Sequence, residues 1–200
     1  MSRRVFDILA SSAGVVVVVL LVIAGGLLTW GHVFASNNVH QQLSQQQIYF
    51  PPKAAFDHPK VGTEITPSMI PSVSQYAGQQ LLTGEQAKTY ADDFIAVHLS
   101  EMPYGGLYSK VSAAALANPK NTQLQNLEQT VFRGTTLRSM LLNAYAFSTI
   151  ATIMLWGAIA SFIAAACMGV LVGLGFWHAR RTEEDERILA PKPKAVPASS

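Results

Sequence analysis

Two long stretches without charge constrain this sequence more than any other feature. No Asp, Glu, Lys or Arg lies between Asp7 and Lys53, and none lies between Arg138 and Arg180. Each stretch contains an apolar run longer than the roughly 20 residues that a helix needs to cross a bilayer. Because backbone hydrogen bonds must be satisfied internally in lipid, each run is expected to be helical. The sequence therefore predicts an all-α membrane protein with two transmembrane helices.

The composition excludes several other classes of protein. Charged residues make up 13% of the chain and hydrophobic residues 50%, whereas soluble domains carry about 25% charged residues. The net charge of +2 supplies no basic field, so no nucleic-acid partner is expected. The single cysteine, Cys167, allows neither an intrachain disulfide nor a thiolate metal site built from one chain. An ordinary soluble enzyme and a disordered chain are both disfavoured.

The predicted organisation has five parts. A short cytoplasmic N-terminus, residues 1–7, precedes transmembrane helix 1 at residues 8–35. The alternative, a secretory signal cleaved after Ala35, is disfavoured because the apolar run is about twice the usual signal length. Residues 36–140 are expected to form a helical extracytoplasmic domain. A long helix at residues 141–178 includes transmembrane helix 2, and residues 179–200 are expected to be a disordered tail.

The positive residues near the membrane predict the orientation. Arg3 and Arg4 precede the first span, and Arg180 and Arg181 follow the second. The segment between the spans holds seven basic and seven acidic residues. The positive-inside rule then places both termini in the cytoplasm, in a multi-pass protein of the plasma membrane.

Local signals divide the segment between the spans. A polar continuation of the first helix is expected over residues 36–47, followed by a Pro-rich extended strap over residues 48–74. Thr83-Gly-Glu-Gln86 is a capping box that predicts a helix to about Met102, where Pro103-Tyr-Gly-Gly106 ends it. One face of that helix carries Ala87, Ala91, Phe94, Ile95 and His98.

The C-terminal half predicts two further helices. A short helix is expected over residues 109–117. Asn118-Pro119, a cap residue before a proline, then predicts the start of a helix that runs to about Ala179. Such a helix would be about 90 Å long, so much of it must stand outside a bilayer core of about 30 Å.

A ladder of small residues occupies the second span. Its members follow one another at steps of four and are Gly157, Ser161, Ala165, Gly169 and Gly173. Small residues let a second helix backbone approach closely, which is how helices associate in lipid. The ladder therefore predicts a helix-packing interface, and its partner is either the first span or another subunit.

Catalytic and metal-binding patterns are weak. His98 and Glu101 form one pair on a helix rather than a set of three or four ligands, and Asp92 and Asp93 point to different helix faces. We therefore expect neither enzymatic activity nor a cofactor, a metal or a small-molecule substrate. An oligomeric channel or transport component is the alternative function, with a pore lined by the hydroxyl residues Ser148, Thr149, Thr152 and Ser161.

Four short segments carry a resemblance to a family. They are Gln47-Ile-Tyr-Phe-Pro51, Tyr76-Ala-Gly-Gln79, Gly84-Glu-Gln-Ala87 with Tyr90-Ala91, and Leu141-Leu-Asn-Ala-Tyr145. On these segments the chain resembles uncharacterised two-pass membrane proteins of actinobacteria over residues 1–180. The resemblance implies no activity. By analogy of architecture with small subunits of respiratory assemblies, we expect an accessory or stabilising subunit that acts through protein–protein interaction or self-association.

Overall fold

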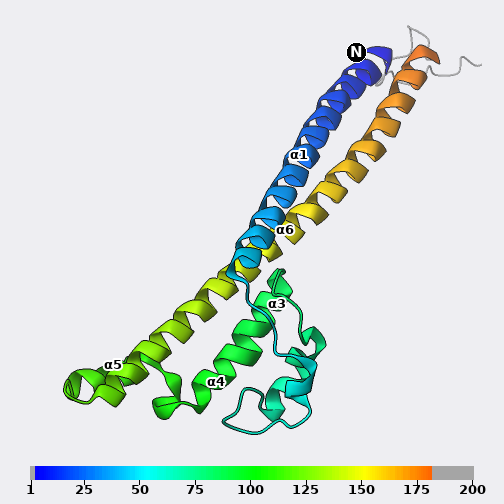
Figure 1. Ribbon diagram of the computed structural model, residues 1–200. Coiled ribbons are helices and arrows are strands. Elements are labelled where there is room, and N and C mark those ends of the chain that lie inside the picture. Colours follow the sequence, from blue (N-terminus) through cyan, green and yellow to red (C-terminus); the bar gives the residue numbers. More distant parts are fainter. Residues whose placement is uncertain (1–2, 182–200) are drawn as a thin grey trace, which may run out of the picture. The chain divides into compact units, whose positions relative to one another are not determined.

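The computed structural model describes residues 3–181, and every regular element in that range is helical (Figure 1). Two long helices dominate, α1 at Arg3–Gln46 and α6 at Thr122–Arg181. Between residues 3 and 181 the only extended pairing is an isolated antiparallel bridge of Tyr49 with Gln80. The predicted all-α class is confirmed. So is the continuation of the first helix through its polar segment, while the predicted tail lies almost entirely outside the described residues.

The chain divides into two compact units. The first comprises Met1–Trp30 and Leu155–Ser200, and the second comprises Gly31–Met154. Both long helices contribute to each unit, so different parts of one helix pack in different surroundings.

In the first unit, α1 and α6 lie side by side (Figure 1). Ala158, Ala165 and Ala179 of α6 are buried at intervals of seven and fourteen residues, and Val172, which fills the same repeat between the last two, faces Gly14 of α1. A seven-residue repeat keeps one seam of a helix facing its partner. Glycines allow the close approach from both sides, because Gly14 of α1 faces Val172 and Gly175 of α6 faces Ser11.

Both long helices have the length and apolarity needed to cross a membrane. Only 11% of the most apolar window in α1 and 6% of that in α6 is buried within the chain. The core helix of a soluble protein would be mostly buried, so these low values fit a helix that faces lipid. The described chain is thus compatible with two membrane spans.

The second unit has a conventional core. Its centre is contributed by segments far apart in sequence, from α1, from α6 and from the region between them. The fully or nearly fully buried members are Val39, Leu43, Phe50, Ile65, Met69, Val73, Leu81, Ala87, Ala91, Ile95 and Leu141.

The Pro-rich segment does not form one extended strap as predicted. It folds into short turns, η1 at Lys53–Phe56, η2 at Pro67–Met69, α2 at Ile70–Val73 and η3 at Ser74–Tyr76. Pro occupies the first turn of η2 and of α2, where its fixed φ favours a helix and its missing N–H costs nothing. The prolines therefore start short helices as well as forbidding a long one.

The capping box is confirmed and begins α3, Gly84–Thr89. The Thr83 hydroxyl oxygen accepts from the backbone N–H of Gln86 at 3.2 Å. In return, the side-chain oxygen of Gln86 accepts from the backbone N–H of Thr83 at 3.1 Å. A π-helical turn, Tyr90–Ile95, links α3 to α4, Ala96–Glu101. The predicted break follows at η5, Pro103–Gly106, where a Cβ on Gly106 would collide with the Leu99 carbonyl.

The predicted start of the last helix at Asn118-Pro119 is wrong. Helix α5 is Tyr108–Ala117, and the Asn118 side chain donates back to the Ala114 carbonyl at 3.1 Å. Asn118 is thus occupied in ending α5. The Asn121 side chain caps α6 instead, accepting from the amides of Gln123 and Leu124 at 3.1 and 3.2 Å.

Candidate functional site

The small-residue ladder of α6 divides into a part that contacts α1 and a part that does not. A Cβ on Gly157 would lie 3.2 Å from Leu28 Cδ1, and Ala165 is buried. Ser161 is half-buried. Around Gly169 and Gly173, by contrast, no described atom beyond the adjacent residues and the local backbone of α6 would lie within 4 Å of an added Cβ.

The helical repeat explains this division. A step of four residues turns an α-helix by about 40° beyond a full turn, so the four steps between its five members spread the ladder over nearly half of the helix circumference. The seam that faces α1 follows the seven-residue repeat instead. Ala165 belongs to both patterns, whereas Gly173 is exposed.

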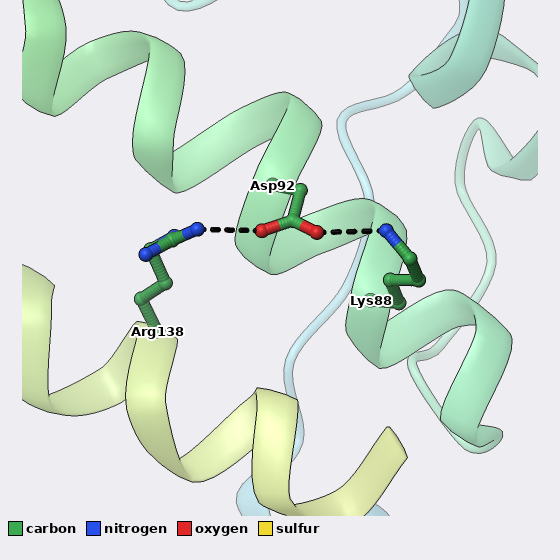
Figure 2. A network of polar contacts seen from close by, with 3 residues as sticks. All are labelled: Lys88, Asp92 and Arg138. Carbon is green, nitrogen blue, oxygen red and sulfur yellow. Dashed lines mark hydrogen bonds and ion pairs between the residues drawn. The ribbon is translucent and has the colours of Figure 1, made fainter. Parts of the chain in front are cut away.

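An ion-pair cluster joins α6 to the helix that begins at α3 (Figure 2). One carboxylate oxygen of Asp92 accepts from Arg138 Nη2 at 2.7 Å, and the other accepts from Lys88 Nζ at 2.8 Å. Asp92 lies in the π-helical turn, and Lys88 lies four residues before it. The Asp92 side chain is 28% exposed, so water screens the cluster only partly.

Each member of the cluster favours the charged form of its neighbour. The hydrogen bond from Lys88, helped by Arg138, lowers the pKa of Asp92 below its ordinary 3.8, although burial opposes the shift. The hydrogen bond to Asp92 raises the pKa of Lys88 above its ordinary 10.5. Arg138 Nε is buried without a hydrogen-bond partner among the described residues. The guanidinium of Arg138 therefore depends on Asp92 for its hydrogen bond and for its opposite charge. The cluster attaches two helices and presents no reactive group.

Sequence reasoning missed this cluster. The Lys88–Asp92 pair has the four-residue spacing of a helix-surface ion pair and was visible in the sequence. Arg138 lies 46 residues away from Asp92, and no local signal connects them.

The two members of the predicted His98–Glu101 pair have separate partners. The His98 ring pairs through Nδ1 with the Phe94 carbonyl at 2.9 Å, while Glu101 accepts from the Gly62 amide at 3.3 Å. Within residues 3–181 no three His, Cys, Asp or Glu side chains gather as metal ligands.

The pore candidates of α6 bond to their own helix. Thr149 donates to the Tyr145 carbonyl and Thr152 to the Ser148 carbonyl, each at 3.0 Å. Ser148 is half-buried, and its side chain fills the space where Gly84 lacks a Cβ. Ser148 therefore packs against the start of α3, whereas Thr149 and Thr152 are exposed and bond within α6.

The four segments behind the family resemblance come together in the second unit. Phe50 donates its amide to Gln79 at 2.9 Å, which pairs the first two segments. The Phe50 ring lies 5.1 Å from that of Tyr76 and 5.3 Å from that of Tyr90. A Cβ on Gly84 would lie 3.3 Å from Tyr145 Cα, so the third and fourth segments also meet. Together they contribute Phe50, Ala87, Ala91 and Leu141 to the core of this unit.

No family model, curated protein or solved structure matches this chain.

Proposed function

We propose that the protein is a non-catalytic, two-pass protein of the plasma membrane with both termini in the cytoplasm and most of the Gly31–Met154 unit outside it. Support comes from the two long apolar helices and from the arginines that flank them on one side. Tryptophans support the same boundaries, because Trp30 and Trp156 are exposed at one end of the apolar runs and Trp177 at the other. From Trp156 to Trp177 the helix rises about 30 Å, the thickness of a hydrocarbon core.

Thiol labelling tests this topology. In a Cys167→Ser background, Leu116→Cys introduces a thiol at a position that is 78% exposed in the second unit, and Ser199→Cys introduces one near the C-terminus. An impermeant maleimide added to intact cells should label only the Leu116→Cys protein. Permeabilised cells serve as the control, in which both should react. Labelling of Ser199→Cys alone in intact cells would reverse the topology.

The activity that we propose is the binding of another membrane protein. The protein would act as an accessory or stabilising subunit of a membrane complex, such as a respiratory assembly. The observation that carries this proposal is the open space beside Gly169 and Gly173 on α6, next to a seam already occupied by α1. Small residues on a lipid-facing surface permit a second helix to pack closely, and close packing drives association in lipid.

Leucine substitutions separate the two faces of α6. Gly169→Leu should abolish co-purification of the partner and leave the α1–α6 pair intact, because an added Cβ at that position meets no atom of α1 within 4 Å. Gly175→Leu should separate α1 from α6 through a collision with Ser11. Met168→Leu is the control and should change both associations little, because it conserves volume.

The measurement is mild-detergent purification with mass spectrometry, together with crosslinking between α1 and α6. If the Gly169→Leu protein keeps its partner at the parental level, the open face is exposed to lipid and the proposal fails. Recovery of the parent protein alone as a monomer would also refute it. A ring of identical subunits would favour the channel alternative.

A further inference from the structure

The helix ends in the first unit form a positively charged cluster. His178 Nε2 lies 3.9 Å from Asp7 Oδ2, and Gly175 faces Ser11, so the end of α6 lies beside the start of α1. The charged residues at these two helix ends are Arg3, Arg4, Asp7, Arg180 and Arg181. Four guanidinium groups against one carboxylate leave a net charge of +3 before any contribution from His178.

An aromatic side chain accompanies these charges. Trp177 is 53% exposed, and the guanidinium carbon of Arg181 lies 4.2 Å from the centre of its ring. Exposed tryptophan marks the depth of lipid headgroups in membrane proteins. Arginine beside it presents planar donors that match the two free oxygens of a phosphate diester.

We propose that this cluster, defined by Arg3, Arg4, Arg180, Arg181 and Trp177, binds the phosphate of an anionic phospholipid in the cytoplasmic leaflet. The inference depends on the proposed membrane topology. Juxtamembrane arginines at an anionic surface each strengthen binding by about fivefold. The site selects a lipid with net negative charge, because a zwitterionic headgroup brings a cation that the arginines repel.

A competitor for the arginines lies in the sequence itself. Acidic residues occupy positions 183–186, outside the described residues, and Arg3, Arg4 and His178 already engage other groups of the chain. Anionic lipid must displace or share the existing contacts of these three side chains. Four carboxylates that follow Arg180 and Arg181 closely in sequence also compete for the arginines, so the acidic run should lower the apparent affinity for lipid. Neutralising that run should then increase the lipid preference.

Tryptophan quenching measures which lipid lies beside the cluster. The full chain carrying Trp30→Phe and Trp156→Phe keeps Trp177 as its only tryptophan. It is reconstituted in phosphatidylcholine vesicles that contain, in matched amounts, brominated phosphatidylglycerol or brominated phosphatidylcholine. We expect at least about twofold stronger quenching by the anionic lipid at low salt, with a smaller difference at high salt because ions screen exposed charges.

Charge-matched variants test the arginines. The first triple variant is Arg3→Gln/Arg4→Gln/Arg180→Gln, which keeps the Arg181–Trp177 contact. It should remove the difference in quenching between the two lipids. Lys110→Gln/Lys120→Gln/Arg133→Gln removes three charges from exposed positions of the second unit and should keep the difference. Replacing the acids at 183–186 with their amides should enlarge the difference in quenching between the two lipids.

The outcomes separate this inference from the topology on which it rests. If Trp177 is quenched by neither lipid and the protein does not float with vesicles, the membrane proposal itself fails. Equal quenching by both lipids in a protein that floats overturns only the lipid site. The preference for anionic lipid could instead appear only after the acids at 183–186 are neutralised. The arginines of the parent protein would then pair with those acids and not with lipid, which also overturns the inference.

Discussion

The two units of this protein share the helices α1 and α6 but are stabilised in different ways. In the first unit, alanine and glycine bring α1 and α6 together, and most large side chains point outward. In the second unit, large aromatic and aliphatic side chains are buried, and an ion-pair cluster joins the helices. Water drives the burial of apolar surface, whereas lipid does not, so helices in lipid associate through close backbone packing. This difference in packing between the two units is expected if only the first unit lies in the bilayer.

The largest effect should come from the core of the second unit. Phe50 is 2% exposed and touches two other rings, so Phe50→Ala should cost about 3–5 kcal/mol in free energy of unfolding. Tyr49→Ala, at an exposed neighbouring position, is the control. Limited proteolysis and denaturant titration of the detergent-solubilised protein measure the loss.

The matching truncation in the first unit sharpens the comparison. Ile163→Ala, at an exposed position of α6, should change the unfolding free energy by less than about 1 kcal/mol. If Ile163→Ala were as costly as Phe50→Ala, the two units would not differ in the way described.

A smaller effect is expected where α3 meets α6. A Cβ on Gly84 collides with Ser148, so Gly84→Ala should cost about 2 kcal/mol of stability through overpacking. Ser148→Gly in the same protein removes the obstructing side chain and should restore much of that loss. The double-mutant cycle, measured by denaturant titration, reports this coupling. Additive costs would show that α3 does not pack there.

A loss smaller than that at Gly84 is expected in the ion-pair cluster. Asp92→Asn should cost about 1 kcal/mol, because the groups are partly screened but Arg138 loses its partner. Asp93→Asn is the control for the loss of one charge from the same turn.

The pH dependence of that cost has a definite sign. The pKa of Asp92 is lowered in the folded protein, so its contribution is present above its ordinary value of 3.8 and is lost as the pH falls through the lower folded value. The pKa of Lys88 is raised, so its contribution is present below 10.5 and is lost at higher pH. Stability of parent and Asp92→Asn proteins should therefore differ by a constant amount from about pH 5 to pH 9. A difference that grew in acid would contradict the assignment.

Local signals in the sequence predicted much of the secondary structure. Two charge gaps identified the long helices, the Thr83–Gln86 box identified the start of α3, and Pro103 identified the end of α4. Each of these signals acts within a few residues, on backbone groups that the same segment must satisfy. The error at Asn118 has the same origin, because two Asn residues near one Pro offer equivalent caps and packing decides between them.

The tertiary structure decided which residues meet across the chain. The four-residue spacing placed Gly157 and Gly173 in one ladder. Only the position of α1 in the folded chain shows that Gly157 faces α1 and that Gly173 faces open space. Likewise, Asp92 and Arg138 meet only because the π-helical turn lies against α6. Apolar length and backbone capping are properties of a segment, so the sequence alone determined that the chain is helical and has two apolar runs. A seam or an ion pair between helices depends on how one helix is rotated toward another, and only the folded chain sets that rotation.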